Sequence, residues 1–193
     1  MKRKSVGYEH SMCVQPAFLI GTYDEAGNVN FAPITWVSVT CDKDRYMLVI
    51  SMFGAKKKTK LNAMKTRLLS ANLVSTDMLG LMDYFGSVSG GAGVKDKREY
   101  GYSEGEVLHV PTLDMSRWVY ECEVTDIVHT GDSDTFFCEV KNVQIDEDID
   151  ITDGIDLTLF EPVVYSGLYH SIGEKLGKIG DFLTVCPKNE VKE

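Results

Sequence analysis

The sequence predicts a mainly β protein, an antiparallel barrel with a few helices packed outside it. Six or so strand-like segments run through the chain, and two or three helical segments are inserted among them. They do not follow the strand–helix–strand alternation of a doubly wound parallel sheet, so an antiparallel barrel is favoured. The chain has 193 residues, of which 44% are hydrophobic and 25% are charged. This length and composition indicate one folded domain, and no repeat or long linker divides the sequence.

The first strands flank a turn. An apolar run covers residues 17–23 and ends in the turn formers at 24–28, and a second extended run follows over 29–40. Two strand patterns around an Asp/Gly/Asn turn predict a hairpin. Residues 45–51 are apolar almost throughout, which predicts a third strand that is buried on both faces.

Helical spacing follows the third strand. Leu61, Met64 and Leu68 recur every three or four residues with charged residues between them, which predicts a helix over 56–68 with an apolar face. Residues 69–75 then return to a strand pattern.

A second helix is predicted over 78–85, with a broad apolar face. Thr76 and Asp77 precede it and are good N-caps. The segment 87–93 is rich in Gly and Ser, which predicts a loop after this helix.

Strand patterns dominate the later part of the chain. Residues 118–125 alternate between apolar and polar positions, which predicts a half-buried strand. The turn formers at 131–134 separate it from a partner strand over 135–145, and a slip in the alternation there predicts a bulge. The expected core side chains of the first strand are Tyr120, Cys122 and Val124, and the expected polar ones are Glu121, Glu123 and Thr125.

Two segments near the C-terminus give weaker patterns. Residues 146–161 are acidic and include no Lys or Arg, which predicts a surface or sheet-edge position. Residues 171–182 hold glycines at weakly helical spacing.

The charge and hydropathy of the chain exclude several classes of partner. A formal net charge of −9 disfavours a general nucleic-acid binder. The longest apolar stretches are far too short to span a membrane. Lys2, Arg3 and Lys4 are not followed by the apolar core of a signal peptide. We therefore expect a cytoplasmic protein that binds neither nucleic acid nor membrane.

Neither a metal site nor a disulfide framework is indicated. The five cysteines are scattered and form no CxxC motif, so Cys122 and Cys138 are expected to be buried thiols. The four histidines lack metal-ligand spacing. Asp148, Asp150 and Asp153 suggest a calcium loop, but the Gly and Glu that such a loop needs are absent.

One segment suits a phosphate group. Ser51 ends a predicted strand, Gly54 loosens the backbone, and lysines crowd a helix start at 56–60 together with Thr59. Hydroxyl, ammonium and free N–H groups at a helix N-terminus bind a dianionic phosphate well. Two other interpretations remain open: a solvated basic helix face, and a non-enzymatic polyanion- or nucleic-acid-binding module that uses residues 56–67.

A second segment suits an aromatic heterocycle. Asn30 and Thr35 can hydrogen-bond such a ring, and Trp36 can stack on it. Taken alone, this signal is weak, because most tryptophans lie in the core of a protein.

Together these residues resemble the flavin reductase-like family of FMN-binding split barrels, and especially its flavoredoxin-like branch. The resemblance covers roughly residues 12–182 and leaves 1–11 and 183–193 as terminal extensions. It rests on short motifs in a consistent order, which are Asp24-x-x-Gly27, Val29-Asn30-x-Ala32-Pro33-x-Thr35-Trp36, Ser51, Lys58-Thr59, Asn72, Ser89-Gly90, Lys95-Asp96-Lys97, Val110-Pro111, Glu121-Cys122-Glu123-Val124, Glu161-Pro162-Val163-Val164-Tyr165, Tyr169 and Gly173-Glu174-x-Leu176-Gly177.

The resemblance implies an FMN bound non-covalently at the edge of the barrel. Its ribityl and phosphate groups would meet the strand end and the helix start, and its isoalloxazine ring would meet the segment around Trp36. Lys95 and Lys97 would lie near the pyrimidine side of the ring or near the phosphate. The cofactor-binding residues implied are Asn30, Thr35, Trp36, Ser51, Met52, Phe53, Lys58, Thr59, Lys95, Lys97, His129 and Tyr165.

The resemblance also implies a homodimer with its site near the subunit interface. The reaction would be hydride transfer from NAD(P)H to the flavin, followed by passage of electrons to an acceptor. The hydride step needs no general acid or base, so no catalytic residue is predicted. A flavin reductase that uses NAD(P)H and a flavoredoxin that exchanges electrons with a protein partner are both open.

Overall fold

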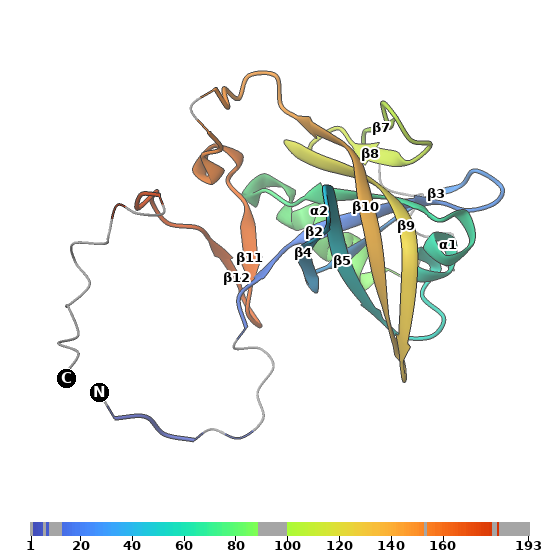
Figure 1. Ribbon diagram of the computed structural model, residues 1–193, viewed down its shortest axis with the longest axis horizontal. Helices are drawn as coiled ribbons and strands as arrows, with labels where there is room; N and C mark the ends of the chain where they lie inside the picture. Colours follow the sequence, from blue (N-terminus) through green and yellow to red (C-terminus); the bar gives the residue numbers. More distant parts are fainter. Residues whose placement is uncertain are drawn as a thin grey trace.

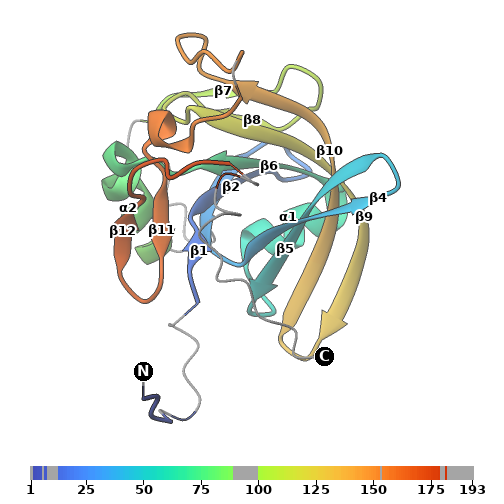
Figure 2. The same ribbon diagram turned by 60° about the vertical axis from the view of Figure 1, so that its left-hand side comes forward.

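The structure, a computed structural model, describes residues 2–5, 7, 13–88, 100–152, 154–178 and 181 (Figure 1). Its main feature is a seven-stranded antiparallel sheet with the strand order β3-β2-β6-β9-β10-β5-β4. The sheet coils into a barrel that stays open between its two edge strands (Figure 2). The strands are β2 (Phe18–Tyr23), β3 (Val29–Ile34), β4 (Val37–Asp42), β5 (Arg45–Phe53), β6 (Leu68–Leu73), β9 (Trp118–Thr130) and β10 (Ser133–Ile145). The predicted mainly β, antiparallel fold is confirmed.

Smaller elements cover the barrel. A three-stranded sheet joins β1 (Gln15–Pro16), β11 (Val163–Tyr165) and β12 (Tyr169–Ser171), and β7 (Tyr102–Glu104) pairs with β8 (Pro111–Leu113). The helices are α1 (Lys58–Thr66) and α2 (Leu79–Ser87), with short 3₁₀ turns at η2 (Thr76–Met78) and η5 (Leu157–Phe160). In Figure 1, α1 lies at one end of the barrel, while β11 and β12 lie on the opposite side.

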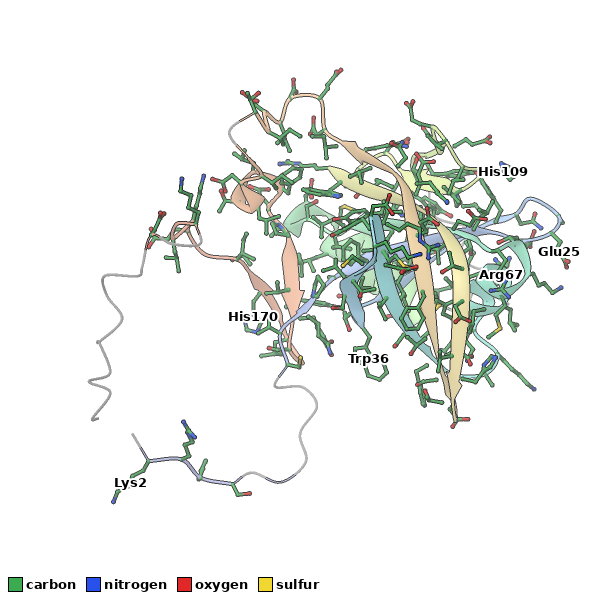
Figure 3. The ribbon with its side chains drawn as sticks, viewed as in Figure 1. Lys2, Glu25, Trp36, Arg67, His109 and His170 are labelled. Atoms are coloured by element: carbon green, nitrogen blue, oxygen red, sulfur yellow. The ribbon has the colours of Figure 1, made fainter. Side chains whose placement is uncertain are left out.

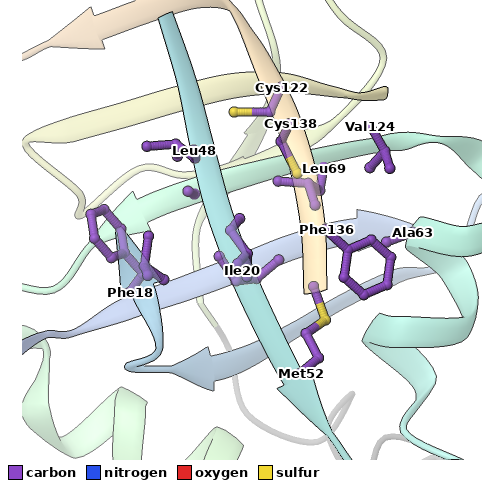
Figure 4. Packing of buried hydrophobic residues seen from close by; sticks show 13 residues of the cluster. Phe18, Ile20, Leu48, Met52, Ala63, Leu69, Cys122, Val124, Phe136 and Cys138 are labelled. Atoms are coloured by element: carbon purple, nitrogen blue, oxygen red, sulfur yellow. The ribbon is translucent and has the colours of Figure 1, made fainter. Parts of the chain in front are cut away.

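Two apolar clusters form the core. The first fills the barrel, where side chains of β2, β5, β6, β9 and β10 point toward one another, Ile20, Leu48 and Phe136 among them (Figure 4). The second lies under α2 and includes Leu19 and Phe31. Strand β2 faces both clusters, which explains why its sequence is apolar almost throughout.

The predicted hairpin around the turn at 24–28 is confirmed. The Asp24 carboxylate accepts the Asn28 amide (3.0 and 3.1 Å) and the backbone N–H groups of Asn28 and Ala26. Hydrogen bonds from the Asn28 side chain and backbone lower the pKa of Asp24 to about 2. Gly27 has φ +81°, a left-handed conformation that glycine adopts without strain.

The extended run over 29–40 is not one strand. It divides into β3 and β4 at Thr35 and Trp36, and the two strands lie at opposite edges of the main sheet. Backbone bonds fix this link, because the Val37 N–H donates to the Thr35 carbonyl and the Ser51 N–H donates to the Trp36 carbonyl. The two residues therefore bridge the opening of the barrel.

The helix expected over 56–68 is shorter and turns a polar side inward. Leu61 of the expected apolar face is 42% exposed, whereas Thr59, Lys60 and Asn62 are buried. Burial of these polar groups is tolerated because each has a partner; the Asn62 amide, for example, donates to Thr22 Oγ1 at 3.1 Å. Met64 of the expected face does pack against the barrel core, so periodicity located only part of the buried side of this helix.

Two local predictions about helix ends are wrong. Thr76 and Asp77 do not cap α2; they lie in the 3₁₀ turn before it, and the α2 N-cap is Met78, which makes no side-chain cap bond. Residues 172–178 of the expected helical tail have no helical structure. The loop predicted for 87–93 begins as the last turn of α2, and its residues 89–93 lie outside the described residues.

Glu121, expected on a polar face, is fully buried. Its carboxylate accepts the backbone N–H groups of residues 106, 107 and 108 at 3.0, 2.9 and 2.7 Å, and the amides of Asn142 and Gln144 at 2.8 Å. Burial raises the pKa of Glu121, but these hydrogen bonds outweigh burial and lower the pKa overall. Only glycine fits at 105, since a Cβ there would lie 2.6 Å from Glu121 Oε2.

Other predictions for the later strands are confirmed. β9 and β10 form one long hairpin, and its register shifts between Phe137 and Cys138 and again between Val140 and Asn142. Cys122 and Cys138 are buried free thiols.

Within the described residues, no helix is both long enough and apolar enough to cross a membrane.

Candidate functional site

A cavity of about 920 Å³ opens beside the N-terminus of α1. Its walls come from the β2–β3 turn and β3, the β3–β4 link, the end of β5 with the loop into α1, α1 itself, and the end of α2. The Trp36 ring projects outward beside β4 and is 43% exposed (Figure 3). The lining residues are Asp24, Glu25, Asn30, Ala32, Pro33, Ile34, Thr35, Trp36, Ser51, Met52, Phe53, Lys56, Lys57, Lys58, Thr59, Lys60, Leu61, Asn62, Lys65, Phe85, Gly86, Ser87 and Val88.

The first turn of α1 presents open N–H groups at this cavity. Its N-cap is Lys57, which makes no side-chain cap bond, and its first turn holds no acid. The first N–H groups of a helix lack intrahelical partners and carry a partial positive charge. The helix start is therefore suited to an anionic group.

Three of the lysines around the cavity are already paired with carboxylates. Lys58 Nζ lies 3.4 Å from Asp24 Oδ2. Lys65 Nζ lies 2.5 Å from Glu25 Oε2, and Lys60 pairs with Asp134.

Two lysines at the cavity differ from these. Lys56 and Lys57 are exposed, and neither forms an ion pair with a carboxylate of the described residues. Within the part of the chain that the structure describes, the cavity thus has two lysine charges without a carboxylate partner.

One wall is built by side chains that bond to each other. Asn30 Nδ2 donates to Thr59 Oγ1 at 2.6 Å, and both residues are buried. Ser51 Oγ and Thr135 Oγ1 are 2.8 Å apart. Asn30 and Thr59, expected to meet different parts of one ligand, therefore share a single polar wall.

The β3–β4 link is tied to the smaller sheet. Thr35 Oγ1 donates to Gln15 Oε1 at 2.8 Å. Gln15 pairs with Tyr165 across β1 and β11. Tyr165 is therefore one strand removed from Thr35 and is not among the lining residues.

Most of the predicted cofactor-binding residues meet at this cavity, and their role stays a prediction. His129 and Tyr165 do not line it; His129 lies against Asp134, and Tyr165 lies in β11. Lys95 and Lys97 lie outside the described residues. Those that line the cavity are Asn30, Thr35, Trp36, Ser51, Met52, Phe53, Lys58 and Thr59.

Several residues at or near the site were missed. The sequence indicates Asp24 as a turn former and as part of a family motif, but not as a carboxylate at the cavity, and it places Asp134 in a turn although Asp134 lies in β10. Phe85 and the residues after it come from the end of a helix without a binding motif. Gln15 gives no signal, because its partner Thr35 is 20 residues away along the chain.

An open antiparallel barrel with a cavity between its edge strands and a basic helix start is the architecture of a split barrel. The model of the flavin reductase-like domain matches residues 10–172, so the chain belongs to the flavin reductase-like family. No curated protein matches the sequence.

Solved structures show the same fold. Flavoredoxin of Desulfovibrio vulgaris (Miyazaki F) superposes with a TM-score of 0.83 at 21% identity, covering 93% of this chain and 98% of that one. Flavoredoxin from Methanosarcina acetivorans gives 0.85 at 19% identity, covering 96% and 100%. An FMN-binding protein from Thermus thermophilus, with p-hydroxybenzaldehyde bound, gives 0.73 at 24% identity, covering 92% and 97%. The family and these neighbours support a flavin-related redox role.

Proposed function

We propose that the cavity binds FMN non-covalently, and that the protein passes hydride or electrons through this flavin between NAD(P)H or a protein donor and an acceptor. One observation carries the proposal. The same cavity holds a helix start without a side-chain cap, two lysines that have no carboxylate partner among the described residues, and, beside them, the exposed ring of Trp36. A ligand with a phosphate at one end and a planar ring at the other matches these two features of the cavity.

Charge supports the placement of the phosphate. A phosphate monoester carries about two negative charges at neutral pH. Lys56 and Lys57 supply two positive charges without carboxylate partners in the described chain, and the α1 N–H groups add their dipole. The hydroxyl of Thr59 and the ammonium of Lys58 line the same end.

The other end suits the isoalloxazine ring. Trp36, Met52 and Phe85 offer apolar and aromatic surface there, and Asn30 and Thr35 offer polar groups at its border. Ligand pockets combine these features, an apolar lining and a few placed polar groups. A volume of about 920 Å³ lies within the range of small-molecule sites.

Bound flavin would supply the hydride and electron chemistry. The residues of this chain hold and orient it: the α1 turn at the phosphate, and the β3–β4 link with the end of β5 at the ring. None of them is assigned as a general acid or base. Lys95 and Lys97 remain candidates for the pyrimidine side, as the sequence predicts.

A homodimer belongs to the proposal. Phe53 at the cavity and Val128 on the neighbouring hairpin are 62% and 45% exposed. They lie at the same end of the sheet, because Ser51, two residues before Phe53, pairs with Thr135, and Thr135 pairs with Val128. A second copy would cover this apolar surface beside the cavity. A redox protein partner and a cytoplasmic location stay predictions of the sequence.

The alternative function, a polyanion-binding module that uses residues 56–67, is less well supported. Lys58, Lys60 and Lys65 of this stretch already pair with carboxylates of the same chain. The overall charge of −9 would also repel a nucleic acid.

The direct test is the visible spectrum of purified protein after FMN is added and free flavin is removed by desalting. We expect a retained flavin spectrum that NADH or NADPH bleaches without oxygen. A retained spectrum that neither nicotinamide bleaches would make a protein donor the source of electrons. No retained flavin, together with strongly salt-dependent binding of a polyanion, would favour the alternative.

A further inference from the structure

The tip of the β9–β10 hairpin binds the first turn of α1 through an ion pair and a hydrogen bond, and it does so outside the cavity. One carboxylate oxygen of Asp134 pairs with Lys60 Nζ, and the other bonds to His129 Nδ1. The Lys60 and Asp134 side chains are only 4% and 7% exposed. The Asp132 carbonyl also accepts Lys60 Nζ at 3.4 Å.

The same tip holds the loop that enters α1. The Asp132 carbonyl accepts the Gly54 N–H at 3.0 Å, and Gly54 has φ +92°. The segment 54–60, the phosphate turn, is therefore fastened to the hairpin tip at both of its ends, by Gly54 and by Lys60. Lys56 and Lys57 lie between these two fastenings. Asp134 itself is not among the residues that line the cavity.

We propose that Asp134 is a positioning residue for the phosphate turn: by holding Lys60 it keeps the turn in the shape that receives an anion. This inference rests on the proposed function. The proposed effect of Asp134 on FMN affinity is opposite to the effect expected from its charge, because a carboxylate near an anion site should by charge alone weaken anion binding. Loss of Asp134 would then improve binding if charge dominated, and impair binding if position dominates.

The burial of the pair favours position. Removing one member of a buried ion pair leaves the other charge uncompensated, and the structure relaxes to hydrate it. Lys60 lies in the first turn of α1, so its movement toward water moves the N–H groups that face the cavity. The charges of Asp134 and Lys60 cancel. The pair therefore fixes the position of the turn without changing the positive charge that Lys56 and Lys57 supply.

The test compares two flavins on one variant. Riboflavin carries the ring and ribityl chain of FMN and lacks the phosphate, so it does not sense the phosphate turn. In Asp134→Asn we expect FMN to bind about tenfold more weakly, while riboflavin affinity, followed by flavin fluorescence, stays within about twofold. Unchanged or tighter FMN binding would overturn the proposal, and so would an equal loss for both flavins.

Asp132→Asn is the matched control. It removes the same charge from the same hairpin tip, and its backbone carbonyl, which makes the contacts to Gly54 and Lys60, remains. We expect wild-type affinity for FMN, or slightly tighter binding. A loss equal to that of Asp134→Asn would mean that any substitution at the hairpin tip disturbs the phosphate turn, which would overturn the specific role of the buried pair.

A double variant, Lys60→Met with Asp134→Leu, replaces the pair with apolar side chains and leaves no buried charge. We expect its FMN-to-riboflavin affinity ratio to return to within about threefold of wild type, since buried pairs tolerate apolar replacement. A ratio as low as that of Asp134→Asn would show that Lys60 meets the phosphate directly, which overturns the proposal. If the wild-type protein binds neither flavin, the proposed function fails, and this role of Asp134 fails with it.

Discussion

Glu121 and Asp134 are the buried carboxylates of the described chain, and both lie on the β9–β10 hairpin. Among the described residues, Glu121 meets only neutral donors: three backbone N–H groups of the loop between β7 and β8, and the amides of Asn142 and Gln144. Asp134 meets the ammonium of Lys60 and the ring of His129.

This difference separates two uses of a buried charge. The dipoles around Glu121 satisfy it completely and fix a loop that does not line the cavity. Asp134 instead holds a residue that does line the cavity, so its partner belongs to the proposed site. The comparison predicts that stability depends mainly on Glu121, and ligand affinity mainly on the α1 turn.

The largest expected effect is on stability. Glu121→Gln turns one acceptor oxygen into an NH₂ group that faces N–H donors, so buried donors lose their partner. We expect a loss of about 3 kcal/mol in the free energy of unfolding, measured by urea titration. The FMN-to-riboflavin affinity ratio should not change. Glu123→Gln on the exposed face is the control, with an expected cost below about 1 kcal/mol. A changed affinity ratio in Glu121→Gln would contradict the claim that Glu121 affects stability and not ligand affinity.

The next effect concerns the lysines at the cavity. Replacing Lys56 and Lys57 together with Ala should weaken FMN binding by about 10- to 100-fold, the range expected for losing hydrogen bonds to a charged group. Riboflavin binding should be unaffected. Lys65→Ala, from the same basic stretch but paired with Glu25, should leave FMN binding within about twofold. An equal loss in Lys65→Ala would mean that the ligand senses only overall charge.

The smallest effect is on the pH dependence of stability. The hydrogen bond from Lys60 lowers the pKa of Asp134 below its ordinary value of 3.8. A lowered pKa contributes stability that is present above the unfolded pKa and is lost as the pH falls through the folded pKa. Below about pH 4 the unfolding free energy of wild type should therefore fall more steeply than that of Asp134→Asn, by at most about 1.4 kcal/mol per pH unit. If the unfolding free energies of the two proteins fell in parallel with pH, the partners of Asp134 would not stabilise its charged form.

Local patterns explain what could be predicted from the sequence. The hairpin at Asp24 follows from turn chemistry within five residues, and the strands follow from runs of apolar side chains. Glu121 could not be placed from its own strand, because its donors come from residues 106–108, 142 and 144. Alternation predicted a solvent-facing side chain, and long-range hydrogen bonds decided otherwise.

The candidate site, like the fold, could be predicted where local residue types indicate it and not where distant segments complete it. Two segments, around Thr35 and around Thr59, were singled out by their own residue types, and the fold brings them to one cavity. The sequence could not show which lysines are free, because Asp24, Glu25 and Asp134 neutralise the others from distant segments. For the same reason Gln15 and Asp134 were not recognised beside the site.

The strand order has a consequence for how the protein folds. Among the described residues, all those that line the cavity come from residues 24–88, yet β5 and β6 also pair with β10 and β9, which come from residues 118–145. These pairings join segments far apart in the chain, and such contacts form only after large loops have closed. A growing polypeptide thus contains all of these lining residues well before it contains the strands that set them in register. The cavity is therefore a late product of folding, and flavin can stabilise the native barrel but cannot template its first strands.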